Sequence, residues 1–97
     1  MAGNIRVTPE ELFTKAQEYT EASGRVQDLV STLDGYRNQL EAMWDGQARE
    51  AFIAQYDELK PSFQRMGTLL EEVSQQIRST GQTLQDTDQQ IASNIRG

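Results

Sequence analysis

The protein has 97 residues, a formal net charge of −6 and neither cysteine nor histidine. A chain of this length forms one domain, and without these two residue types it lacks disulfides, thiolate metal sites, the commonest general base and any Ser-His triad. We therefore expect no enzyme, no cofactor and no metal ion. The acidic balance and the lack of a basic run also argue against nucleic acid and stable membrane insertion.

Two further absences concern location. No apolar segment approaches the roughly 18–20 residues that span a bilayer. The first residues, MAGNIRVTPEE, contain no apolar core of the kind found in secretory signal peptides. Composition alone therefore indicates a cytoplasmic protein.

The first predicted element is a helix over residues 8–43. The stretch VTPEE places Thr8 at the N-cap and Pro9 at the first helical position, and Glu11 completes a capping box. A row of mostly apolar residues then recurs at alternating spacings of four and three from Leu12 to Trp44, broken only by Ser23 and Arg37. A second row beside them holds Ala22, Leu29, Tyr36 and Met43. The apolar face is wide, as in a helix with more than one neighbour.

A turn is predicted over residues 44–47, formed by Trp44, Asp45 and Gly46. Gly46 is expected to end the first helix in a left-handed conformation, and Asp45 to help cap the second. Trp44 continues the apolar row of the first helix, so a packing role at the end of the hairpin is expected for it.

The second predicted helix covers residues 48–92. Its apolar row runs from Phe52 to Ile91 at the same spacings, through Phe63 and Leu84. Pro61 should bend this helix or loosen one turn. Gly67 and Gly81 should weaken it, and a flexible C-terminal tail is expected after residue 92.

These elements predict an all-α fold: a single domain over residues 1–97, built as an antiparallel helical hairpin. One hairpin cannot cover the wide face of its first helix, so we predict a homodimer that forms an elongated four-helix bundle. A lone hairpin and a heterodimer are the alternatives. The expected core and dimer face comprises Leu29, Val30, Leu33, Tyr36, Leu40 and Met43.

The end of the second helix carries one more pattern. Leu84, Asp88, Ile91 and Ile95 follow one another at spacings of four, three and four, which places them on one side of a helix. Two interpretations remain open: a segment that docks into a partner's groove, or a frayed end that completes the dimer.

The chain resembles the WXG family of small secreted proteins, the ESAT-six-like or Esx-type substrates of type VII secretion systems. The resemblance covers the whole chain and depends on its length, its two helical halves and the central WDG. The stretches TPEELFTKAQEY, WDGQA, LLEEVSQQI and DQQIASN are similar to Firmicute members. The tail looks like the export pattern of that group. The actinobacterial form of this signal begins with tyrosine, whereas position 84 is leucine.

The resemblance implies export without a cleaved signal peptide, as a folded dimer, through a machine driven by an FtsK/SpoIIIE-type ATPase. The protein would then be a secreted, virulence-associated, non-enzymatic interaction protein with its export signal at Leu84, Asp88, Ile91 and Ile95. The first alternative is an adaptor or chaperone that helps other substrates to be exported. A second alternative, membrane lysis by an amphipathic helix, is disfavoured by the acidic charge.

Overall fold

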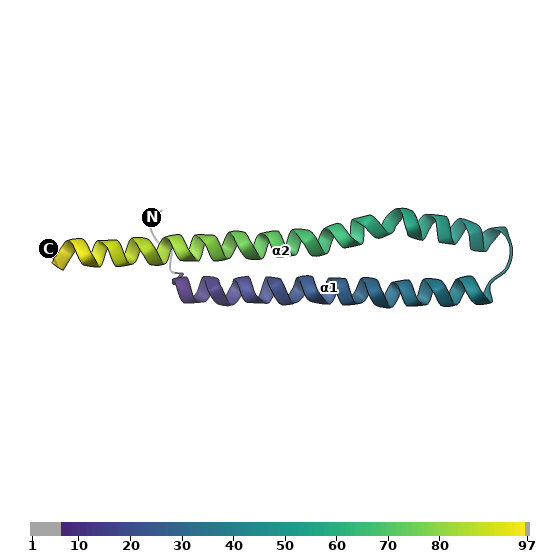
Figure 1. Cartoon of the computed structure of the whole chain (residues 1–97), viewed down its shortest axis with the longest axis horizontal. Helices are drawn as coiled ribbons and strands as arrows, with labels where there is room; N and C mark the ends of the chain where they lie inside the picture. Colours follow the sequence, from purple (N-terminus) through teal and green to yellow (C-terminus); the bar gives the residue numbers. More distant parts are fainter. Residues whose placement is uncertain (1–6, 97) are drawn as a thin grey trace.

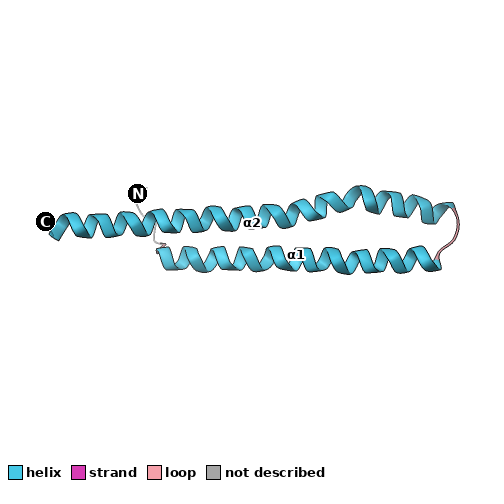
Figure 2. Cartoon of the chain, in the orientation of Figure 1, coloured by secondary structure: helices cyan, strands magenta, loops and turns pink. Residues whose placement is uncertain are grey.

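The protein is a long helical hairpin. The computed structural model describes residues 7–96, which form two helices, α1 (Pro9–Met43) and α2 (Gln47–Arg96), and no strand. The two helices run antiparallel, side by side, and the hairpin measures 77 × 22 × 16 Å (Figures 1 and 2). The predicted all-α hairpin is confirmed.

The start of α1 is held by the predicted capping box. The Thr8 side-chain oxygen accepts a hydrogen bond from the Glu11 backbone N–H at 3.1 Å, and the Thr8 N–H donates to Glu11 Oε1 at 2.8 Å. Pro9 occupies the first turn, where its missing N–H costs nothing. These contacts satisfy backbone groups that a helix start otherwise leaves without partners.

The turn differs from the prediction in the role of its glycine. α1 ends at Met43, and Trp44 is extended with φ −124° and ψ 127°. Gly46 has a φ of +100°, and its carbonyl accepts hydrogen bonds from the N–H groups of Arg49 and Glu50. Gly46 therefore opens α2 and does not end α1. Among residues 7–96, no hydrogen bond joins the Asp45 side chain to the start of α2, so its predicted capping role was wrong.

α2 is much longer than α1 and projects beyond it. It has 50 residues against 35, and its C-terminal end continues past the start of α1 (Figure 1). The helix reaches Arg96, whereas the sequence predicted an end near residue 92 and a flexible tail. Pro61 lies inside α2, and in Figure 1 the teal, N-terminal part of this helix bows away from the line of the rest. A missing N–H and ring crowding are the physical causes of such bending.

The helices approach most closely along what we call the small-residue seam, formed by Ala16, Ser23, Gly67, Ser74 and Gly81. All five are buried. The Ser23 hydroxyl donates to the Gly67 carbonyl at 2.6 Å, and the Ser74 hydroxyl donates to the Ala16 carbonyl at 2.8 Å. These bonds cross from one helix to the other, so they fix the register as well as satisfying buried hydroxyl groups.

The seam corrects the sequence interpretation of α2. The predicted apolar row lies beside the interface, and members such as Leu70 and Ile77 are half-buried there. The fully buried positions lie one step around the helix, at Gly67, Ser74 and Gly81. A Cβ atom at Gly81 would lie 2.9 Å from Phe13 Cε1. The missing side chain lets the Phe13 ring of α1 pack directly on α2, and this packing role outweighs the low helix propensity of glycine.

Candidate functional site

An aromatic cluster marks the turn end of the hairpin. The ring centroids of Trp44 and Phe52 lie 5.7 Å apart, and those of Phe52 and Tyr56 lie 6.4 Å apart, both pairs tilted. Trp44 is half-buried, while Asp45 and Gly46 are exposed. Such pairs add about 0.5–1.5 kcal/mol each beyond the area they bury. The Trp44 ring therefore anchors the turn to the first turns of α2.

Arg49 ties the turn to the end of α1. Its Nη1 donates to the Glu41 carbonyl at 3.3 Å, and its guanidinium also pairs with Glu50. The last turn of α1 contains no basic residue. Arg49 therefore supplies, from α2, the positive charge that favours a helix C-terminus. The hydrogen bond to Glu50 raises the pKa of Arg49 further above its ordinary value.

A polar cluster joins the two helices just below the aromatic rings. Asp34 accepts a hydrogen bond from the Tyr56 hydroxyl at 2.8 Å and lies 2.9 Å from Lys60 Nζ. The bond from Lys60, together with that from Tyr56, lowers the pKa of Asp34. Burial and the bond to Asp34 raise the pKa of Tyr56 to about 12. The cluster therefore favours the charged form of Asp34 and the protonated form of Tyr56.

A second ion pair lies one helical turn farther along. Arg37 Nε donates to one oxygen of Asp57 and Nη2 to the other, both at 3.2 Å, and Nη1 donates to Glu41 at 2.9 Å. The bonds to Asp57 raise the pKa of Arg37. The Asp57 side chain is half exposed, so solvent weakens this pair. The two hydrogen bonds from Arg37 to Asp57 therefore fix the orientation of the helices relative to each other more than they raise the free energy of unfolding.

One broad side of the hairpin is apolar, and we call it the apolar face. A cavity of about 360 Å³ opens on it between the two helices. Its lining comprises Leu33, Tyr36, Arg37, Leu40, Phe52, Tyr56 and Phe63. Around it, Leu29, Tyr36 and Met43 expose 55%, 56% and 76% of their surface. Exposed apolar groups this large and this close together are typical of an interaction site.

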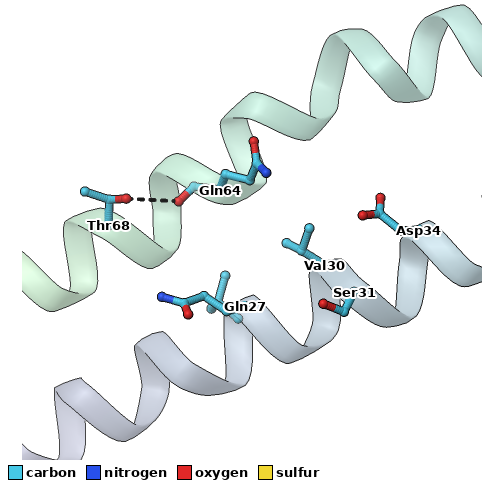
Figure 3. A pocket seen from close by; sticks show the side chains of 7 residues that line it. Gln27, Val30, Ser31, Asp34, Gln64 and Thr68 are labelled. Atoms are coloured by element: carbon cyan, nitrogen blue, oxygen red, sulfur yellow. Dashed lines mark hydrogen bonds between the residues drawn. The ribbon is translucent and has the colours of Figure 1, made fainter.

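The other broad side is polar. Asp34 follows Leu33 and Gln64 follows Phe63, and both of these preceding residues line the apolar cavity, so Asp34 and Gln64 point about 100° away from it. A cavity of about 330 Å³ lies there, and polar side chains from both helices surround Val30 at its floor (Figure 3). The hairpin is thus amphipathic as a whole.

The predicted core and dimer face divides between two environments. Val30 is buried against α2, and Leu33 and Leu40 are half-buried beside the 360 Å³ cavity. Leu29 and Met43 remain exposed, and Tyr36 is exposed although it also lines that cavity. Four of the six predicted residues therefore contact α2 or line the apolar cavity, namely Val30, Leu33, Tyr36 and Leu40. The exposed side chains of Leu29, Tyr36 and Met43 are free to contact another chain.

The predicted export segment lies at the opposite end of the molecule from the turn. Leu84 is half-buried in a groove of about 400 Å³ that Leu12 and Val7 also line. Asp88, Ile91 and Ile95 are exposed, because α1 does not extend alongside them (Figure 1). These residues continue the side of α2 that α1 covers elsewhere, since Asp88 and Ile95 follow Gly81 at intervals of seven. Within one chain, Trp44 and Asp88 cannot form a single surface.

The described residues contain few groups suited to chemistry. No cluster of three or more acidic side chains in residues 7–96 could hold a metal ion. Neither described helix is apolar enough over its length to cross a membrane. The buried hydroxyls of Ser23 and Ser74 are used in helix–helix hydrogen bonds.

Sequence reasoning missed the polar cluster and the seam. Asp34, Tyr56 and Lys60 lie on two helices, and nothing in their sequence spacing links Asp34 to the other two. The seam could have been recognised in the sequence, because Gly67, Ser74 and Gly81 are spaced by seven residues, as are Ala16 and Ser23. A repeat of small residues at that spacing indicates close helix contact.

Comparison with known proteins gives consistent matches along the chain. The family described as WXG100, proteins of 100 residues with WXG, matches residues 4–89. Protein YukE of Bacillus subtilis is 50% identical over the full length of both chains. The type VII secretion system extracellular protein A of Staphylococcus aureus is 36% identical over 94% of each. The crystal structure of Geobacillus thermodenitrificans EsxA superimposes with a TM-score of 0.85 at 49% identity, covering 94% of this chain and all of that one.

Proposed function

This chain belongs to the WXG100 family, and on that basis we propose that it is a substrate of a type VII secretion system, exported as a folded dimer. The relative in Staphylococcus aureus is named as an extracellular protein of such a system. After export the protein acts by binding and not by catalysis. In support, both helices expose large apolar side chains, and the sequence offers neither histidine nor cysteine.

The observation that carries this proposal is the uncovered end of α2. Ile91 and Ile95 expose 52% and 79% of their surface, and Asp88 lies on the same side of the helix. An apolar helical stripe with no cover in its own chain is suited to docking in a partner's groove. The partner we propose is the FtsK/SpoIIIE-type ATPase of the secretion machine, with Leu84, Asp88, Ile91 and Ile95 as the export signal.

The dimer forms through the apolar face. Leu29, Tyr36 and Met43 gain cover when a second hairpin packs there, which produces a four-helix bundle. In an antiparallel dimer, the turn of one chain approaches the export segment of the other. Trp44 and Asp88, separated by the length of the molecule in one chain, then contribute to one composite surface.

Export assays test the proposal directly. Asp88→Ala and the double change Ile91→Ala, Ile95→Ala are expected to retain the protein in the cells and to deplete it from the culture supernatant. Asp86→Ala is the matched control, because Asp86 is an exposed carboxylate two residues away that bonds Gln82 within its own helix. Undiminished export of both Asp88 and isoleucine variants would remove the signal role from this segment.

A further inference from the structure

We propose that the cavity on the polar side of the hairpin binds a neutral, hydroxyl-rich ligand of the size of one sugar ring. We call this space, of about 330 Å³, the polar cavity. Its polar lining residues come from both helices (Figure 3): Gln27, Ser31 and Asp34 of α1, and Gln64 and Thr68 of α2. Because it opens away from the apolar face, it stays accessible when a second chain covers that face.

The polar cavity combines an apolar floor with a polar rim. Val30 is buried at the floor and Val26, which also lines the cavity, is half-buried. A sugar ring has the matching pattern, because C–H groups occupy its two faces and hydroxyl groups project from its edge. Sites for small molecules likewise join an apolar lining to a few placed polar groups. The face of the ring would therefore lie on the valines and its hydroxyl groups would meet the rim.

Two groups of the rim have hydrogen-bonding capacity to spare. Within residues 7–96, no hydrogen bond uses the Ser31 hydroxyl or the side-chain amide of Gln64, whose backbone carbonyl alone accepts a bond, from Thr68. A carboxamide donates and accepts, so Gln64 can accept from one sugar hydroxyl and donate to its neighbour. An apolar ligand would cover these groups without giving them partners, which costs free energy.

The charge of the lining favours a neutral ligand. Asp34 is the only charged residue that lines the polar cavity, and it already bonds the Tyr56 hydroxyl and Lys60 Nζ. The lining therefore offers no cation to hold a phosphate or a carboxylate. A cationic ligand would have to compete with Lys60 for Asp34. A neutral ligand meets neither obstacle.

Contacts between the helices hold the polar cavity in shape at both ends. At one end the Ser23 hydroxyl bonds the Gly67 carbonyl at 2.6 Å, and a Cβ atom at Gly67 would lie 3.4 Å from Gln27 Cγ. The Gln27 side chain therefore packs closely on α2. At the other end Asp34 bridges to Lys60 at 2.9 Å. Groups that are already in place lose less conformational entropy when a ligand binds.

Titration of the full chain with glucose, followed by nuclear magnetic resonance, tests the inference. The lining contains no aromatic ring on which a sugar could stack, so we expect a dissociation constant on the order of 1–10 mM. The side-chain amide signals of Gln27 and Gln64 should shift and saturate, and that of Gln75 should not. Glucose 6-phosphate, the charged counterpart, should bind at least roughly threefold more weakly, because its phosphate meets Asp34 and no free cation.

A pair of glutamine variants locates the binding. Gln64→Leu removes an amide from the rim at nearly constant size and is expected to weaken glucose binding at least roughly tenfold. Gln64 is exposed, so this variant should fold. Gln75→Leu is the matched control, because Gln75 is an exposed glutamine of α2 that bonds Glu71 within its own helix. It should keep the natural affinity.

Three outcomes would each overturn the inference: no saturable shift at Gln27 and Gln64, an equal loss of affinity in the two variants, or equal binding of glucose and its phosphate ester. None of these measurements involves export or dimer formation. The proposed function is therefore tested separately, by the export assays described above.

Discussion

The two ends of the hairpin hold the same two helices together by different means. At the open end, the small-residue seam brings backbones close, and buried hydroxyls bond directly to carbonyls of the facing helix. In the turn half, which we define as residues 34–60, none of the residues is buried, and long side chains such as Arg37 and Lys60 span the gap.

This difference shows how one hairpin can have a fixed helix register in one half and an adjustable surface in the other. Backbone contact through small residues leaves no room for adjustment, so the seam determines the register. Salt bridges between exposed groups contribute little and tolerate rearrangement. The turn half can therefore adjust its surface to a partner while the seam keeps the two helices aligned.

Enlarging a seam glycine should have the largest effect. Gly81→Leu forces a side chain against Phe13 and is expected to lower the free energy of unfolding by about 3 kcal/mol, the upper range for overpacking. The matched control is Gly35→Leu, since nothing lies within 4 Å of a Cβ there. It should instead stabilise by roughly 0.5–1 kcal/mol through helix propensity. Urea unfolding at one fixed protein concentration measures both, and equal effects would erase the distinction between seam and surface.

Amide hydrogen exchange should reveal the two halves within the unaltered protein. Residues 47–60 are expected to exchange at least roughly tenfold faster than residues 67–81, because local opening costs less where few groups are buried. Mass spectrometry of peptic fragments reports both segments in one experiment. Uniform protection along α2 would show that the turn half is as firmly held as the seam.

Removing one seam hydroxyl should have a smaller effect. Ser74→Ala deletes the bond to the Ala16 carbonyl and the contact with Thr20 and is expected to cost about 1 kcal/mol. Ser79→Ala, at an exposed position on the same helix, provides the reference and should be nearly neutral. A larger loss at Ser79 would contradict the assignment of Ser74 to the interface.

Acid should have the smallest effect, and it should act in the turn half. The lowered pKa of Asp34 means that its contribution is present at neutral pH and is lost as the pH falls below its ordinary value of 3.8. The difference in unfolding free energy between the natural chain and Asp34→Asn should therefore shrink between pH 7 and pH 3. Asp28→Asn, which alters another exposed carboxylate of α1, serves as the comparison. A difference for Asp34→Asn that does not change with pH would show that its contacts with Lys60 and Tyr56 do not stabilise the fold.

The sequence allowed the local features of the fold to be predicted better than the contacts between its helices. The capping box at Thr8 was predicted correctly because all its groups lie within four residues. The predicted apolar row of α2 flanks the interface, but the fully buried positions are small residues, which a periodicity of large apolar residues does not identify. Gly67 and Gly81 were interpreted as weak points, since their value depends on a facing helix that no local pattern shows.

The candidate sites show the same contrast: their local features were predictable from the sequence, and their contacts between helices were not. The turn position of Trp44 and Gly46 followed from helix lengths and local turn chemistry, although the direction in which Gly46 acts did not. The salt bridges of Asp34 with Lys60 and of Arg37 with Asp57 require knowledge of which helical turns face each other. The roles of Asp88, Ile91 and Ile95 remain predictions, because they concern contacts outside this chain.

The narrow outline of the hairpin has a consequence for transport. At 77 × 22 × 16 Å, the molecule is a rod whose cross-section is small compared with its length. A conduit about as wide as that cross-section could pass one hairpin end-on without unfolding it, while two stacked hairpins need about twice the thickness. If the chain is exported as proposed, the diameter of the opening would decide whether it travels as a pair or singly.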